Sequence, residues 1–96
     1  MKENIEKRSS KDMLIEYISK VKAIKVMQNQ IAELKKNINT LDKDIEEADK
    51  AGLDETVEVL CKARNSLNLE RLELEIYICK LKLWLAEFEK ARQMTR

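Results

Sequence analysis

A single glycine near the middle of the chain, Gly52, is the feature that most constrains the fold. The 96 residues contain no proline and no second glycine, so neither arm carries a residue that breaks a long helix. Glycine readily takes the left-handed conformation that follows a helix C-terminus, and Asp54 can cap a second helix. The sequence predicts a flexible leader at residues 1–8, a first helix over about 10–51, a turn at 52–53 and a second helix over about 54–94.

Apolar residues recur with heptad spacing in both arms. Every seventh residue from Ile24 to Ile45 is isoleucine, and apolar residues fill the d positions between them. Two arms of similar length around a short turn fold back on each other. The expected fold class is therefore all-α, an antiparallel two-helix hairpin that resembles a coiled coil. Its expected hairpin core consists of Ile24, Ile31, Leu34, Ile38, Leu41, Ile45, Leu60, Leu67, Leu74, Ile78, Leu81, Leu85 and Phe88.

The second arm carries a further apolar stripe. At about 100° per residue, five side chains fall on the side of the helix opposite its core residues. A helix with two opposed apolar faces needs two neighbours, and the hairpin supplies only one. We therefore expect this stripe to contact another copy, in a homodimer or a larger homo-oligomeric helical bundle, and another protein. The expected oligomer or partner interface is Leu69, Leu72, Ile76, Cys79 and Leu83.

The same segment also has a pattern that strands show. Between Leu72 and Leu85 apolar and polar residues nearly alternate. However, leucine, glutamate and lysine dominate over valine and threonine, and strong helix formers flank the segment on both sides. No second strand is available for pairing, so we expect a helix here.

Charge is distributed unevenly along the chain. Eight acidic residues and two lysines lie between Asp42 and Glu58, a net charge of −6, whereas the whole chain carries +1. In a hairpin this acidic segment forms the closed tip, and basic residues such as Lys11, Lys90 and Arg92 gather at the open end. An antiparallel pair of hairpins would place each acidic tip beside the basic end of the other copy.

No residue pattern points to catalysis. The chain has no histidine, the commonest general base and transition-metal ligand. Cys61 and Cys79, its only cysteines, match no zinc-binding spacing, and no glycine-rich phosphate loop is present. We expect a protein that is not an enzyme and that has no catalytic residue, no cofactor and no metal site.

The expected function is a protein–protein interaction module: an adaptor, a regulator or an inhibitor. Such lysine-rich, proline-free small proteins are frequent in bacteria and their phages, so a phage-type inhibitor of a host protein is one version. A nucleic-acid-binding protein is one alternative, but a net charge of +1 does not favour it. A peripheral membrane protein is another, but Glu73 and Glu75 beside the stripe do not favour it. The residues expected to contact nucleic acid are Lys20, Lys22, Lys25, Lys35 and Lys36.

The expected location is the cytoplasm. No apolar run is long enough for a transmembrane helix, and the first residues lack the apolar region of a secretory signal. Two cysteines that cannot bridge within one straight helix suit a reducing compartment.

Overall fold

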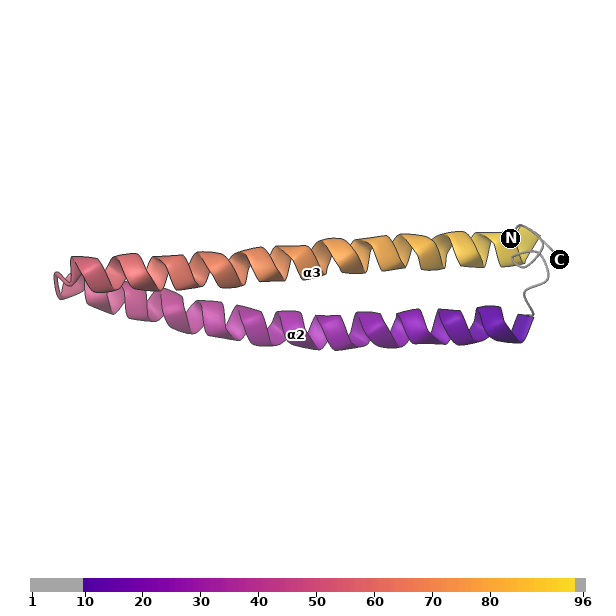
Figure 1. Cartoon of the computed structure of the whole chain (residues 1–96), viewed down its shortest axis with the longest axis horizontal. Helices are drawn as coiled ribbons and strands as arrows, with labels where there is room; N and C mark the ends of the chain where they lie inside the picture. Colours follow the sequence, from indigo (N-terminus) through magenta and orange to yellow (C-terminus); the bar gives the residue numbers. More distant parts are fainter. Residues whose placement is uncertain (1–9, 95–96) are drawn as a thin grey trace.

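The computed structural model describes residues 10–94, which form two long helices joined by one turn (Figure 1). Helix α2 spans Ser10–Lys50 and helix α3 spans Asp54–Met94. The helices run antiparallel in a rod 66 Å long, and both ends of the described chain lie at the open end. Because the described residues contain no strand, the all-helical prediction is confirmed, including the segment from Leu72 to Leu85. The predicted leader at 1–8 lies outside the described residues.

The turn closes α2 through Gly52, whose φ of 72° lies in the left-handed region. The N–H of Leu53 donates to the carbonyl of Ala48, and the N–H of Gly52 donates to the carbonyl of Asp49, each at 3.0 Å. These two bonds form the Schellman motif, which satisfies carbonyls at a helix end. A single residue without a Cβ atom therefore allows the chain to reverse direction.

Helix α3 begins at Asp54, the residue that the sequence predicts as its cap, so the capping position lies one residue earlier. The N–H of Val57 donates to the carbonyl of Leu53 at 2.9 Å, so Leu53 occupies the position that precedes the first turn. Asp54 lies inside that turn with Glu55 rather than capping it. There the two carboxylates stabilise the helix through its dipole, which is positive at this end.

The core between the helices is thin. Its most enclosed part is a cluster of Ile24 and Ile31 from α2 with Ile78 and Leu81 from α3. Among the described residues no side chain is fully enclosed, and Ile78, the best covered, still has 6% of its surface exposed. The reason is geometric, because each seam residue meets one neighbouring helix and stays open at its flanks. The other expected core residues are buried (Ile38) or half-buried (Leu34, Leu41, Ile45, Leu60, Leu67, Leu74, Leu85 and Phe88).

Two arginines interrupt the seam on α3. The Nη1 atom of Arg64 lies 3.3 Å from Oδ1 of Asp42 and donates a hydrogen bond across to α2. Its Nη2 atom donates to Oδ1 of Asn65, also at 3.3 Å. The long side chain therefore keeps its charge at the edge of the seam, where a partner and solvent are available.

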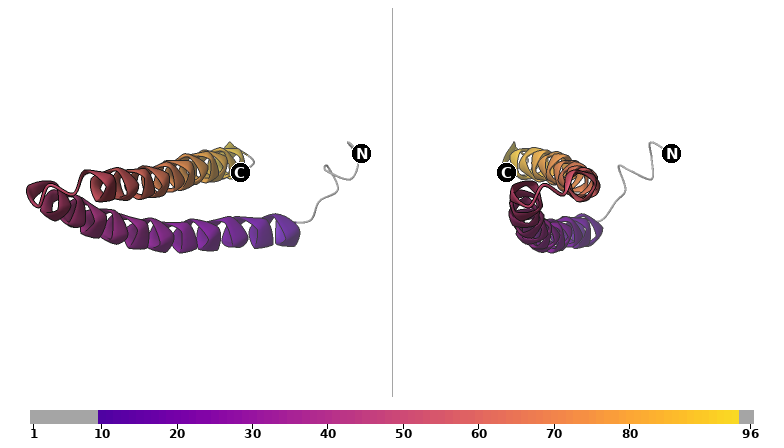
Figure 2. Two further views of the ribbon diagram at one scale, coloured as in Figure 1. Left: turned by 60° about the vertical axis from the view of Figure 1, so that its left-hand side comes forward. Right: turned by 90° about the vertical axis from the view of Figure 1, so that its left-hand side faces the viewer.

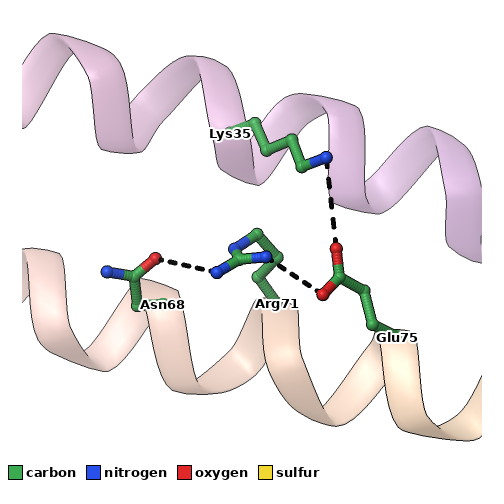
Figure 3. A network of polar contacts seen from close by, with 4 residues as sticks. All are labelled: Lys35, Asn68, Arg71 and Glu75. Atoms are coloured by element: carbon green, nitrogen blue, oxygen red, sulfur yellow. Dashed lines mark hydrogen bonds and ion pairs between the residues drawn. The ribbon is translucent and has the colours of Figure 1, made fainter.

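Arg71, the second arginine, belongs to a small polar network (Figure 3). It donates to Oε2 of Glu75 at 3.0 Å and to Oδ1 of Asn68 at 3.5 Å, both on its own helix. The other carboxylate oxygen of Glu75 lies 4.0 Å from Nζ of Lys35 on α2. Glu75 thus faces the hairpin seam and links the two helices.

Aromatic side chains join the helices at the open end. The rings of Tyr17 and Phe88 lie 5.2 Å apart, and Trp84 stacks on Phe88 at 5.4 Å. The Nζ atom of Lys20 lies 4.7 Å from the centre of the Trp84 ring, within the range of a cation–π interaction. Figure 2 shows that both helices curve gently over their length. The aromatic contacts therefore hold the curved arms together far from the turn.

Candidate interaction surface

The candidate site is the outer stripe, which we define as Leu69, Leu72, Ile76, Cys79 and Leu83 of α3. All five side chains are exposed, and those of Leu69 and Leu83 keep 60% and 62% of their surface. At the same levels of the helix, Leu74 and Ile78 contact the core cluster on the opposite side. Helix α3 therefore has two apolar faces, of which the hairpin covers one.

The outer stripe has the spacing of a coiled-coil seam. Its members follow one another at alternating steps of three and four residues, so Leu69, Ile76 and Leu83 occupy a positions and Leu72 and Cys79 occupy d positions. Such spacing keeps the side chains in a straight row along a supercoiled helix. The row is therefore suited to a second helix that lies alongside α3.

An open hollow runs along the middle of the stripe. Leu72, Ile76, Cys79 and Leu83 line it together with Glu75 and Lys80, and its lining is almost wholly apolar. Between a and d residues, coiled coils have holes that receive the side chains of a facing helix. The hollow is too open to enclose a small molecule, but its shape suits such side chains.

Charged residues border the stripe on both flanks. Glu73 and Lys80 each follow a d position and lie on one flank, whereas Glu75 and Lys82 each precede an a position and lie on the other. Glu75 already contacts Arg71 and Lys35. Within residues 10–94, Glu73, Lys80 and Lys82 form no ion pair. These three charges are therefore available to a partner.

A second group of exposed apolar side chains lies on α2 near the open end. The sequence predicts one broad apolar face from Met13 to Ile24, but the structure divides it. Tyr17 and Ile24 face α3, whereas the remaining members, Met13, Leu14, Ile18 and Val21, are exposed, as is the neighbouring Ile15. The width of this apolar face in the sequence indicates that part of it stays exposed, because one neighbouring helix cannot cover so wide an arc.

The lysines considered for nucleic-acid binding are not grouped as a free basic patch. Lys20 lies 3.6 Å from Glu16 and over the Trp84 ring, and Lys35 contacts Glu75. Lys22, Lys25 and Lys36 are exposed. Two of the five charges are thus engaged within the hairpin, and no observation favours a nucleic-acid interface.

One titratable group at the open end, Tyr17, has a raised pKa. The hydroxyl of Tyr17 donates a hydrogen bond to the Glu89 carboxylate, and this bond and the negative charge of Glu89 raise the pKa of Tyr17. Arg92 opposes the change. The pair contributes to the contacts at the open end, away from the outer stripe.

The thiols of Cys61 and Cys79 are both free. Cys61 is half-buried and Cys79 is exposed. Within residues 10–94, no cluster of potential metal ligands occurs, and neither helix contains an apolar span long enough to cross a membrane.

Comparisons of the chain with protein-family models, with curated proteins and with solved structures found no match. The basis for a functional conclusion is therefore the surface of the hairpin itself.

Proposed function

We propose that the chain is a small helical-hairpin interaction module that self-associates through the outer stripe and performs no catalysis. In this form it would act on another protein as an adaptor, a regulator or an inhibitor. The observation that carries the proposal is the exposure of five side chains at heptad spacing on the face of α3 that α2 leaves uncovered. Burying one leucine or isoleucine contributes about 1.5–3 kcal/mol. Covering four of them would be a large gain beside a typical stability of about 5–15 kcal/mol.

The thin core of the hairpin supports the same proposal. A chain of this size buries a smaller fraction of its surface than a larger domain does, and here no described side chain is fully enclosed. Small domains commonly gain the missing stability from metals, disulfides or oligomerisation. Among the described residues there is no metal-ligand cluster, and both thiols are free. Association between copies is the route for which this surface provides a structural basis.

The molar mass in solution tests the proposal. We expect size-exclusion chromatography with light scattering to give at least two chains for the wild type. The double variant Leu72→Glu/Ile76→Glu should give one chain, because two carboxylates would have to be buried at the centre of the stripe. Its helical circular dichroism should persist, since neither side chain belongs to the hairpin core.

A matched control uses the same chemistry elsewhere on the surface. Val26 and Val59 are also exposed, at 56% and 67%, and lie outside the stripe. The variant Val26→Glu/Val59→Glu should keep the wild-type mass. A wild type that runs as a single chain, or a control that dissociates as readily as the stripe variant, would contradict the proposal.

A further inference from the structure

We propose that the outer stripe binds a second copy of itself in antiparallel orientation, with the two-fold axis level with Tyr77 and Ile78. This inference rests on the proposed function and specifies its partner, orientation and register. In a two-fold symmetric dimer the same patch serves both copies, so it must be complementary to itself. The charges that border the stripe meet that condition in one orientation.

The argument depends on the flank whose two charges, Glu73 and Lys80, form no ion pair within residues 10–94. Glu73 and Lys80 both follow d positions, one heptad apart, and lie on the same side of the stripe. When one helix is turned end for end, this flank faces the same flank of the partner. Glu73 then lies beside the partner's Lys80, and Lys80 beside the partner's Glu73. Charges next to a coiled-coil seam determine orientation in this way.

The parallel orientation gives only one of these two charges an oppositely charged partner. In a parallel pair, residues that follow d positions face residues that precede a positions. Glu73 would then face the partner's Asn68, and Lys80 would face the partner's Glu75. Glu75 is already held by Arg71 of its own helix at 3.0 Å and by Lys35 of α2. The antiparallel pair therefore makes better use of the free charges.

The same register also pairs the apolar side chains well. With the axis level with Tyr77 and Ile78, Leu72 packs against the partner's Leu83, and Ile76 packs against the partner's Cys79. Leu69 then meets the partner's Ala86, which combines a large and a small side chain. A register shifted by one heptad towards the turn would instead place Glu73 beside the partner's Glu73, and like charges repel.

The charge of the whole hairpin favours the same orientation. Residues from Asp42 to Glu58 carry a net charge of −6 at the closed tip. A parallel pair would place two such tips side by side, within about the 8 Å over which physiological salt screens charge. The antiparallel pair separates the tips by most of the 66 Å length of the rod.

A charge exchange tests the orientation without altering the apolar seam. Lys80→Glu places like charges at both symmetric contacts of an antiparallel pair, and we expect the dimer dissociation constant to rise about tenfold. Adding Glu73→Lys should return it to within about threefold of the wild-type value, because both contacts are re-formed with exchanged signs. In a parallel pair the double variant would still place the glutamate introduced at position 80 opposite the partner's Glu75. Its dissociation constant would then stay above the wild-type value.

Disulfide formation provides an independent measurement. Leu72→Cys and Leu83→Cys are introduced separately into chains that also carry Cys61→Ala and Cys79→Ala. After mild oxidation, an equimolar mixture should give the link between positions 72 and 83, confirmed by peptide mapping, whereas each variant alone should remain largely unlinked. Circular dichroism checks that both variants remain helical.

The outcomes separate this inference from the proposed function. A dimer that links position 72 to 72 and 83 to 83, or one without the mixed link and without recovery by charge exchange, overturns the antiparallel register only. A single-chain mass for the wild type overturns the proposed function and the register together. The mixed link and the recovery, found in a chain of dimeric mass, support both.

Discussion

Ile76 and Ile78 are the same residue, two positions apart on one helix, in opposite environments. Ile78 packs with Ile24, Ile31 and Leu81 and keeps 6% of its surface, whereas Ile76 lines an open hollow and keeps 56%. Two residues correspond to a rotation of about 200° around a helix, so the pair samples the inner and outer faces of α3. Side-chain chemistry is equal on both faces. The inner face stabilises the hairpin, and the outer face can add stability only when another molecule covers it.

The largest expected effect comes from shortening each isoleucine in turn. In a Leu72→Glu background, which keeps association out of the measurement, Ile78→Ala should lower the free energy of unfolding by about 2–4 kcal/mol. Ile76→Ala should change it by less than about 0.5 kcal/mol, because its side chain has little burial to lose. Urea unfolding followed by circular dichroism measures both. Equal losses at the two positions would mean that α2 does not cover α3 as described.

An intermediate effect on the free energy of unfolding is expected at the turn, which brings α2 against the inner face of α3 and does not contact the outer face. Gly52→Ala should lower the free energy of unfolding of the hairpin by about 1–2 kcal/mol, because an L-residue is strained at a φ of 72°. Beyond Gly52 and its two chain neighbours, no heavy atom lies within 4 Å of the position of the added Cβ, so the loss comes from the local backbone conformation and not from a clash with packed side chains. Asparagine tolerates this region better, and Gly52→Asn should cost less.

The same turn variants sharpen the comparison of the two faces. The dimer dissociation constant should stay unchanged in Gly52→Ala, since the outer stripe lies far along α3 from the turn. Sedimentation equilibrium at a temperature where the hairpin remains folded measures it. A parallel loss of association would show that the outer face depends on the turn as much as the inner face does.

The predictable part of the fold depends on local rules. One glycine, strong helix formers and heptad spacing are enough to predict two helices and the turn, because each feature acts within a few residues of itself. The division of the apolar face of α2 into inward Tyr17 and outward Ile18 is not predictable in this way. It depends on the angle at which α3 approaches, which only the folded pair determines.

The candidate site was predictable in position but not in its charges. Spacing alone places Leu72 and Ile76 on the side opposite Ile78. The sequence does not reveal that Glu75 turns inward to Arg71 and Lys35 while Glu73 on the other flank has no ion-pair partner among residues 10–94. That distinction depends on side-chain conformations in contact with a helix distant in the sequence. This difference between Glu73 and Glu75 also decides between a parallel and an antiparallel partner.

The smallest expected effect concerns the open end of the inner face. Because the hydrogen bond to Glu89 raises the pKa of Tyr17, its stabilising contribution is present below the ordinary pKa of tyrosine. The contribution is lost as the pH rises through the raised pKa. In a Tyr77→Phe variant, whose only tyrosine is Tyr17, absorbance titration reports this group directly. Adding Glu89→Gln should lower the titration midpoint, and an unchanged midpoint would contradict the assigned pair.

The Schellman turn at Gly52 also constrains how the gene can change in length. Contacting residues on the two arms, such as Tyr17 with Phe88 and Asp42 with Arg64, lie almost equally far from Gly52 along the chain. Deleting one residue from one arm would rotate everything beyond it by about 100° and turn the seam away from its partner helix. Removing a whole heptad from each arm would preserve both faces of α3. Point substitutions at exposed polar positions are therefore tolerable, whereas insertions and deletions within the arms are restricted to matched multiples of seven.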